Sequence, residues 1–129
     1  MDTKELYERG LKLRKDLFGS DTVEKRMQAL GEFGAPLTNM INSYAYGDLW
    51  SRPDLPRKIR SLVTVAINAA MTRPDELRVH VRGALANGCT PEEIREVLLH
   101  VAIYCGIPAS LEAHRVTMDV LKDKGAAKA

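Results

Sequence analysis

Glu76, His80 and Asn87 follow one another in the segment DELRVHVRGALANGCTPEEI at spacings of four and seven residues. At about 100° per residue, these positions and Gly83 lie along one edge of a helix. A glutamate one turn before a histidine can hydrogen-bond to the ring, which orients the imidazole and raises its proton affinity. With the open space left by Gly83, the pattern indicates a general acid beside a small pocket. The alternative is a histidine satisfied at the core boundary beside a solvated glutamate.

A second file of polar residues, Arg60, Thr64 and Asn68, repeats every four residues inside the apolar segment RSLVTVAINAAM. Buried polar groups need partners, and a buried cation needs an anion. A guanidinium can hold a carboxylate through two parallel hydrogen bonds, so Arg60 is a candidate anchor for an acidic substrate. The alternative is an internal salt bridge from Arg60 to Glu76 or Asp48, with hydrogen bonds between helices.

Arg52 is a further cation candidate, in the proline-bounded loop WSRPDLP directly after Trp50. The alternative for such a loop arginine is simple solvation. The three histidines show no HxH, HxxxH or HExxH spacing, so no metal site is expected. The sequence also lacks a glycine-rich phosphate loop and a GxSxG elbow.

The elements that must position these residues are all helical, because glycine and proline separate apolar segments and no stretch alternates as a strand does. Asp21 is expected to cap the second helix, Gly88 to end the fifth, and Thr90 to open the sixth through a capping box with Glu93. The expected helices cover about residues 3–17, 22–31, 36–46, 56–71, 74–87, 91–104 and 109–123.

Two of these helices are apolar on more than one face. The segment LVTVAINAAM is expected to be buried nearly all round. Leu99 and Ile103 lie roughly opposite the stripe of Ile94, Leu98 and Val101. A small monomer has few places to bury both faces, which indicates a homo-oligomer. The alternative is a central helix surrounded by its own chain.

Length and composition indicate one domain covering residues 1–129. Hydrophobic residues make up 45% and charged residues 28% of the sequence, and the net charge is +2. This balance is typical of a globular protein and gives no reason to expect nucleic-acid binding. With neither an apolar run long enough to span a membrane nor an export signal, we expect a cytoplasmic protein. Cys89 and Cys105 form no CxxC and are expected to be free thiols.

Three long segments, AYGDLWSRPDLPRKIRSLVTVA, DELRVHVRGALANGCTPEEIREVLLH and AIYCGIPAS, occur in an order that resembles the carboxymuconolactone decarboxylase family. The similarity runs from YERGLKLRKDLFG to about Val120. It implies an all-α helical bundle shared with the AhpD-like alkylhydroperoxidases, and a hexameric ring of dimers or trimers. AhpD-like enzymes carry a CxxC before the histidine, where this chain has Arg73 and Glu76. Thiol peroxidase chemistry is therefore not expected.

The family resemblance implies decarboxylation of 4-carboxymuconolactone to 3-oxoadipate enol-lactone, in the protocatechuate branch of the β-ketoadipate pathway. The unsaturated lactone itself accepts the electron pair that CO2 leaves behind, so no cofactor is expected. We expect His80, oriented by Glu76, to donate the proton or stabilise the enolate. Arg60 is expected to anchor a carboxylate, and Arg52 is a second candidate.

The remaining expected contacts to the substrate come from Thr64, Asn68 and the apolar walls, with Trp50 and Tyr104 excluding water from the departing carboxylate. The chain departs from the family pattern at Thr22, Tyr46 and Leu111, where histidine, tryptophan and asparagine are expected. Two alternatives therefore stay open: a decarboxylase of another small lactone or acid, and a non-catalytic helical oligomer that binds an acidic metabolite.

Overall fold

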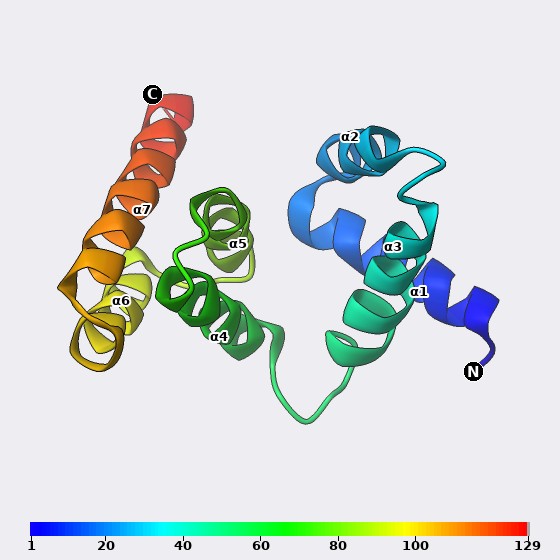
Figure 1. The fold of residues 1–129 in the computed structure, drawn as a ribbon, viewed down its shortest axis with the longest axis horizontal. Coiled ribbons are helices and arrows are strands. Elements are labelled where there is room, and N and C mark those ends of the chain that lie inside the picture. Colours follow the sequence, from blue (N-terminus) through cyan, green and yellow to red (C-terminus); the bar gives the residue numbers. More distant parts are fainter. Residues whose placement is uncertain (129) are drawn as a thin grey trace. The chain divides into compact units, whose positions relative to one another are not determined.

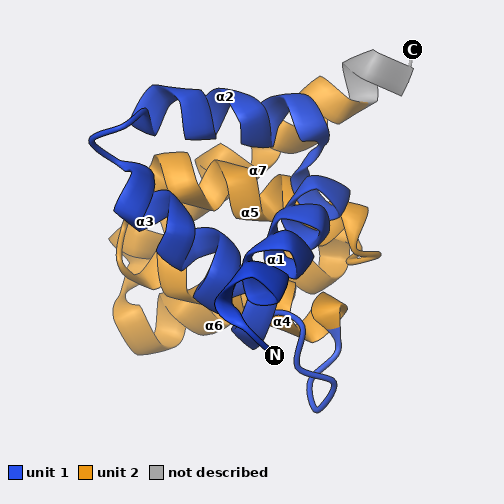
Figure 2. Cartoon of the chain, turned by 90° about the vertical axis from the view of Figure 1, so that its right-hand side faces the viewer, with its two compact units in different colours: residues 1–56 blue, residues 57–129 orange. Residues whose placement is uncertain are grey.

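The computed structural model describes the backbone of residues 1–128 and the side chains of residues 1–124. Within this range every regular element is a helix (Figure 1), which confirms the predicted all-α class. The chain forms two compact units, residues 1–56 and the residues from Arg57 onward (Figure 2). The interpretation of residues 1–129 as a single domain stays a prediction. No helix of the described residues is long and apolar enough to cross a membrane.

The first unit contains α1 (Thr3–Phe18), α2 (Ser20–Leu30), α3 (Ala35–Met40) and the π-helix η1 (Ile41–Leu49). The Asp2 side chain caps α1 by accepting a hydrogen bond from the backbone nitrogen of Glu5 at 2.8 Å. The expected cap of the second helix is wrong. Its N-cap is Gly19, and Asp21 lies inside its first turn, where a negative charge favours the helix dipole.

The expected α-helix over residues 36–46 is also wrong in part, because the chain changes to π-helical hydrogen bonding at Ile41. The backbone nitrogen of Trp50 accordingly bonds the carbonyl oxygen of Ala45, five residues earlier, at 2.9 Å. Such wide turns are rare and occur mostly as short insertions in α-helices.

A close crossing of α1 and η1 accompanies this change. Gly10 of α1 lies directly against η1, since a Cβ on Gly10 would lie 2.6 Å from the backbone nitrogen of Gly47 and would overlap the carbonyl oxygen of Asn42. A Cβ on Gly47 would in turn overlap the carbonyl oxygen of Leu6. Only glycine lets two helix backbones approach so closely at these two positions.

The second unit contains α4 (Arg57–Ala70), α5 (Pro74–Ala86), α6 (Pro91–Cys105) and α7 (Ile107–Lys128). The predicted capping box is confirmed. Thr90 Oγ1 accepts from the backbone nitrogen of Glu93 at 3.0 Å, and Glu93 Oε1 accepts from that of Thr90 at 2.8 Å. The predicted glycine stop after α5 is also confirmed, with Gly88 at φ +90°. Pro108 lies in the first turn of α7, so the expected start at residue 109 is wrong; a proline there removes no intrahelical hydrogen bond.

The core of the second unit lies where its four helices meet. A continuous cluster of buried side chains contains Val65, Ala69, Leu77, Val81, Ala84, Cys89, Ile94, Leu98, Val101, Ala109, Ala113, Val116 and Val120. An ion pair from Lys58 Nζ to Glu93 Oε2, at 2.9 Å, joins the start of α4 to the start of α6. The capping hydrogen bond from Thr90 and the nearby Lys58 ammonium lower the pKa of Glu93.

Replacing Gly10 by alanine should destabilise the protein by about 2–3 kcal/mol, because the added methyl group overlaps the backbone of η1. Urea unfolding followed by circular dichroism measures the change. Lys12→Ala, at an exposed position of the same helix, is the control and should change stability by less than about 0.5 kcal/mol. Equal stability of Gly10→Ala and wild type would contradict the close crossing.

Glu93→Gln should make the protein less stable near neutral pH, because the glutamine cannot pair with Lys58. Since folding lowers the pKa of Glu93, its charge stabilises the fold above the ordinary glutamate pKa, and this contribution is lost as the pH falls through the lowered value. The stability gap between wild type and Glu93→Gln should therefore close on acidification. Glu92→Gln, one residue away, is the control. A gap that stays constant with pH would contradict the assigned role.

Candidate functional site

Helix α5 presents three distinct edges. Leu77, Val81 and Ala84 face the core and are buried. On one flank, Arg78 and Arg82 reach toward α7, with Arg78 Nη2 lying 3.8 Å from Asp119 Oδ2 and Arg82 at the same distance from an aspartate one turn further along α7. The strip of Glu76 and His80 must therefore occupy the other flank.

The strip combines an exposed carboxylate with a half-buried imidazole. Pro74 starts the helix, and Glu76 lies in its first turn, where a carboxylate favours the helix dipole. His80 is half-buried one turn later, and Gly83 is buried. A half-buried imidazole beside an accessible carboxylate can carry a proton to a bound molecule. The catalytic role of these two residues stays a prediction.

The polar file of α4 uses part of its hydrogen-bonding capacity inside the helix. Thr64 Oγ1 donates to the carbonyl oxygen of Arg60 at 2.8 Å, and Asn68 Nδ2 donates to that of Thr64 at 3.0 Å. The Thr64 hydroxyl proton is thus already used, whereas Asn68 has a second amide proton that can be donated. Arg60 is half-buried on the same face. Substrate contacts from these three residues stay predictions.

Asn87, which the sequence places on the strip with His80, has a structural partner. Its Nδ2 donates to Ser61 Oγ on α4 at 2.8 Å, and Ser61 is buried. This hydrogen bond joins the C-terminal end of α5 to α4. It therefore helps to fix the spacing between the helix that carries His80 and the helix that carries Arg60.

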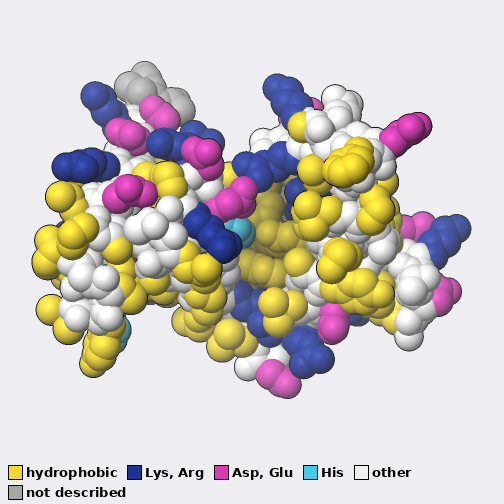
Figure 3. Space-filling view, viewed as in Figure 1, with side chains coloured by type: hydrophobic (Ala, Val, Ile, Leu, Met, Phe, Trp, Pro, Cys, Tyr) yellow, Lys and Arg dark blue, Asp and Glu magenta, His cyan; other side chains and the backbone are white. Residues whose placement is uncertain are grey.

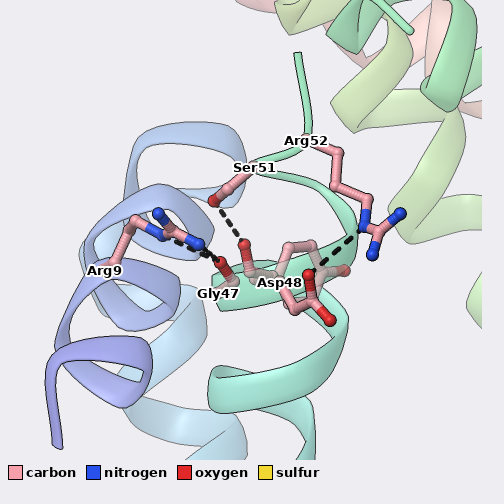
Figure 4. A network of polar contacts seen from close by, with 6 residues as sticks. Arg9, Gly47, Asp48, Ser51 and Arg52 are labelled. Carbon is pink, nitrogen blue, oxygen red and sulfur yellow. Dashed lines mark hydrogen bonds and ion pairs between the residues drawn. The ribbon is translucent and has the colours of Figure 1, made fainter. Parts of the chain in front are cut away.

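The two site candidates of the first unit have local partners. Arg52 Nε lies 3.3 Å from Asp48 Oδ1, and both side chains are exposed (Figure 4). Trp50 is buried and stacks on Tyr46, with ring centroids 5.7 Å apart. Figure 4 also shows Arg9 bonded to the carbonyl oxygen of Gly47. The expected substrate contacts of Arg52 and Trp50 stay predictions.

Tyr104, expected as a wall of the substrate pocket, lies on α6 and stacks on His100 with centroids 5.2 Å apart. It lines a groove between α4 and α6 whose lining includes neither His80 nor Arg60. Within this unit the tyrosine thus borders a different surface from the strip, and its contact with substrate stays a prediction.

The cysteines are free thiols, as predicted. Cys89 is buried and its thiol donates to the carbonyl oxygen of Lys58 at 3.5 Å. Burial and the neighbouring Glu93 raise the pKa of the Cys89 thiol, which disfavours the thiolate that peroxidase chemistry needs. Among the described residues no group of histidine, cysteine and acidic side chains could hold a metal ion.

Sequence reasoning missed a polar link between α6 and α7. Ser110 Oγ donates to the carbonyl oxygen of Leu98 at 2.7 Å, and His114 Nδ1 lies 2.8 Å from the carbonyl oxygen of Ser110. Both donors lie on α7, and only the spacing of four residues between Ser110 and His114 could have indicated the second contact. His114 is half-buried, and its contact lies within α7.

The family model described as "Carboxymuconolactone decarboxylase family" matches residues 35–119, which include both α4 and α5. The chain belongs to the carboxymuconolactone decarboxylase family. A 4-carboxymuconolactone decarboxylase of Acinetobacter baylyi is 41% identical over 127 residues, covering 98% of this chain and 95% of that protein. A nitrosuccinic acid decarboxylase of Metarhizium robertsii is 42% identical over 120 residues, covering 93% of this chain and 84% of that protein.

If the Asn87–Ser61 hydrogen bond holds α5 against α4, the two residues should be energetically coupled. A double-mutant cycle of Ser61→Ala and Asn87→Ala, measured by urea unfolding, should give about 0.5–1.5 kcal/mol of coupling. The cycle of Thr64→Ala with Asn87→Ala is the control and should give almost none, because the Thr64 hydroxyl bonds within its own helix. Equal coupling in both cycles would contradict the assigned contact.

Proposed function

We propose that this protein is a cofactor-independent carboxy-lyase that converts 4-carboxymuconolactone to 3-oxoadipate enol-lactone, in protocatechuate catabolism through the β-ketoadipate pathway. The observation that carries the proposal is the 41% identity over 98% of the chain to a protein named for that reaction. A likeness that spans both helices of the candidate site supports transfer of the chemistry as well as of the fold.

The reaction needs little beyond binding, charge stabilisation and one proton. As the C–C bond to the carboxylate breaks, its electron pair moves through the ring double bond to the lactone carbonyl oxygen. CO2 leaves as this bond breaks, and the resulting enolate is then protonated on carbon. Because the lactone holds the electrons, the protein has to fix two carboxylates, stabilise the enolate oxygen and return a proton.

His80 is our candidate for the proton donor or enolate stabiliser, with Glu76 orienting its ring. The half-buried position of the imidazole supports this role, because a partly desolvated donor acts more strongly on a developing negative charge. Arg60 is our candidate for the carboxylate anchor. Asn68, with an amide proton left to donate, is a better polar contact than Thr64.

A second substrate is favoured by a specific observation. The chain is 42% identical to a nitrosuccinic acid decarboxylase over 93% of its length, against 41% over 98% for the lactone enzyme. Nitrosuccinic acid, like the lactone, carries two carboxyl groups and an internal electron sink, here the nitro group. Both substrates are thus small diacids that can accept the electron pair of the C–C bond that breaks on decarboxylation. The residue differences at Thr22, Tyr46 and Leu111 could then shift the preference among such acids.

We also propose that the protein acts in the cytoplasm as a homo-oligomer, a hexamer or a trimer. Large apolar side chains exposed on both units support association, among them Phe33, Ile103 and Tyr104. Its other partner would be the small diacid alone. Neither the charge of +2 nor the helices of the described residues indicate nucleic-acid or membrane binding.

His80→Ala should lower kcat for 4-carboxymuconolactone by about 10²–10⁴-fold, because the proton donor is lost. Ultraviolet loss of the lactone together with CO2 release measures turnover of the purified protein. His114→Ala, which removes a histidine that bonds within α7, is the control and should keep kcat within a few-fold. Full activity of His80→Ala would remove this residue from the mechanism. A wild-type protein inactive on the lactone but active on nitrosuccinate would overturn the proposed substrate.

Arg60→Lys should raise KM by more than it lowers kcat, because a single ammonium replaces a two-pronged contact to a carboxylate. The same assay measures both constants. Arg95→Lys, at an exposed position on α6, is the control. An unchanged KM for Arg60→Lys would contradict the anchoring role.

A further inference from the structure

The first turn of α4 carries the candidate carboxylate anchor, because Arg60 is the fourth residue of that helix. Helix ends tend to fray, since the first backbone N–H groups have no partner within the helix. The position of Arg60 therefore depends on contacts that hold this turn from outside the helix.

Three side chains from the connection between α5 and α6 and from the first turn of α6 reach the beginning of α4. Asn87 Nδ2 donates a hydrogen bond to Ser61 Oγ at 2.8 Å. The Cys89 thiol donates to the carbonyl oxygen of Lys58 at 3.5 Å. Glu93 Oε2 lies 2.9 Å from Lys58 Nζ. We call this set of contacts the α4 clamp; its residues are Lys58, Ser61, Asn87, Cys89 and Glu93.

The carboxylate of Glu93 is held in place before it meets Lys58. Its Oε1 atom accepts a hydrogen bond from the backbone nitrogen of Thr90 at 2.8 Å, within the capping box of α6. The other oxygen is left for the Lys58 ammonium. Since the two side chains are 42% and 37% exposed, this ion pair contributes little on its own. It acts together with the two hydrogen bonds of the α4 clamp.

Cys89 contacts the backbone of α4 directly. Its side chain is buried, and burial together with the neighbouring Glu93 raises the pKa of the thiol. The thiol therefore stays protonated near neutral pH and can keep donating its hydrogen bond. A carbonyl oxygen has two lone pairs, so the Lys58 carbonyl can accept this bond and the helical one together.

The direction of the Arg60 side chain follows from these contacts. At about 100° per residue, Arg60 lies one step around the helix from Ser61, so holding Ser61 and Lys58 sets the rotation of the turn. The carbonyl oxygen of Arg60 is also bonded by Thr64 Oγ1 at 2.8 Å. Because a shift of about 1 Å in a binding group can cost up to 10²-fold in rate, contacts remote from the substrate can control its binding.

We propose that the α4 clamp positions Arg60 for a substrate carboxylate, which makes Lys58, Cys89 and Glu93 positioning residues for the reaction. This inference rests on the anchoring role of Arg60 in the proposed function. The three side chains act through Arg60 and not on the substrate itself. Loss of the α4 clamp should therefore weaken substrate binding more than it slows the chemical step.

Amide hydrogen exchange tests the α4 clamp without any substrate. The amides of Ser61 and Leu62 bond to carbonyl oxygens of the first turn, so their exchange reports on that turn. In Lys58→Met, which keeps the apolar stem, NMR should show them exchanging about threefold to fivefold faster, with Ala69 unchanged. Lys122→Met is the control. It removes an exposed lysine of α7, a helix over which charged side chains of both signs gather at the upper left of Figure 3. Equal exchange in Lys58→Met and wild type would overturn the α4 clamp, whatever the substrate.

The kinetic test asks whether Lys58 acts through Arg60. Lys58→Met should raise KM for 4-carboxymuconolactone by about threefold to fivefold and leave kcat within about twofold. Lys58→Arg, which can still pair with Glu93, should keep KM near the wild-type value. In an Arg60→Met background, where KM is already raised, Lys58→Met should change KM by less than about 1.5-fold, because no guanidinium is left to position.

The outcomes separate the α4 clamp from the proposed function. If Arg60→Met raises KM but Lys58→Met does not, the positioning role is overturned and the anchoring role of Arg60 stands. The same holds if Lys58→Met raises KM equally in both backgrounds. If Arg60→Met leaves KM unchanged, the anchoring role itself is wrong, and the positioning role is overturned with it.

Discussion

The packing of α4 against α5 is the contact on which the candidate site depends. Val65 and Ala69 of α4 belong to the same buried cluster as Leu77 and Val81 of α5. The Asn87–Ser61 hydrogen bond joins the C-terminal end of α5 to the N-terminal half of α4. Because the core residues fix the rotation of each helix about its axis, they also fix the direction of the polar side chains on α4 and α5. The salt bridges from α5 to α7 restrict the rotation of α5 further.

This arrangement explains how a small helical protein can support chemistry without a cofactor. A substrate that accepts the electron pair left by the departing CO2 needs only a few hydrogen-bond donors from the protein. Helices hold such side chains more rigidly than loops do. Val63 and Ile67 of α4 are 46% and 51% exposed, so the expectation that this segment is buried nearly all round is wrong for the single chain.

Local signals in the sequence predicted much of this fold. Gly88, Thr90 and Glu93 act over a few residues, so their motifs define the end of α5 and the start of α6 without help from the rest of the chain. The π-helix could not be predicted, because η1 pairs with α1 through Gly10 and Gly47, which lie far apart in sequence. No periodicity within either segment reports that approach.

In the candidate site, too, the sequence predicted which side chains share a helix face but not their contacts with other helices. The helical wheel placed Glu76 and His80 on the flank of α5 left by the core and by the arginines that reach α7. It also grouped Asn87 with them, and only the three-dimensional contact with Ser61 shows that this amide has a structural use. Spacing predicts which side chains share a face, but the partner of each side chain depends on the neighbouring helix.

The central claim is that a diacid binds beside His80. The most direct measurement is the nitrogen NMR spectrum of the imidazoles during titration with a non-reactive saturated lactone diacid, because the chain has only three histidines. If a diacid binds beside His80, the NMR signals of the His80 ring nitrogens should shift on saturation while those of His100 and His114 stay in place. A His80 signal that does not move while the ligand binds would contradict the account and place the diacid elsewhere on the protein.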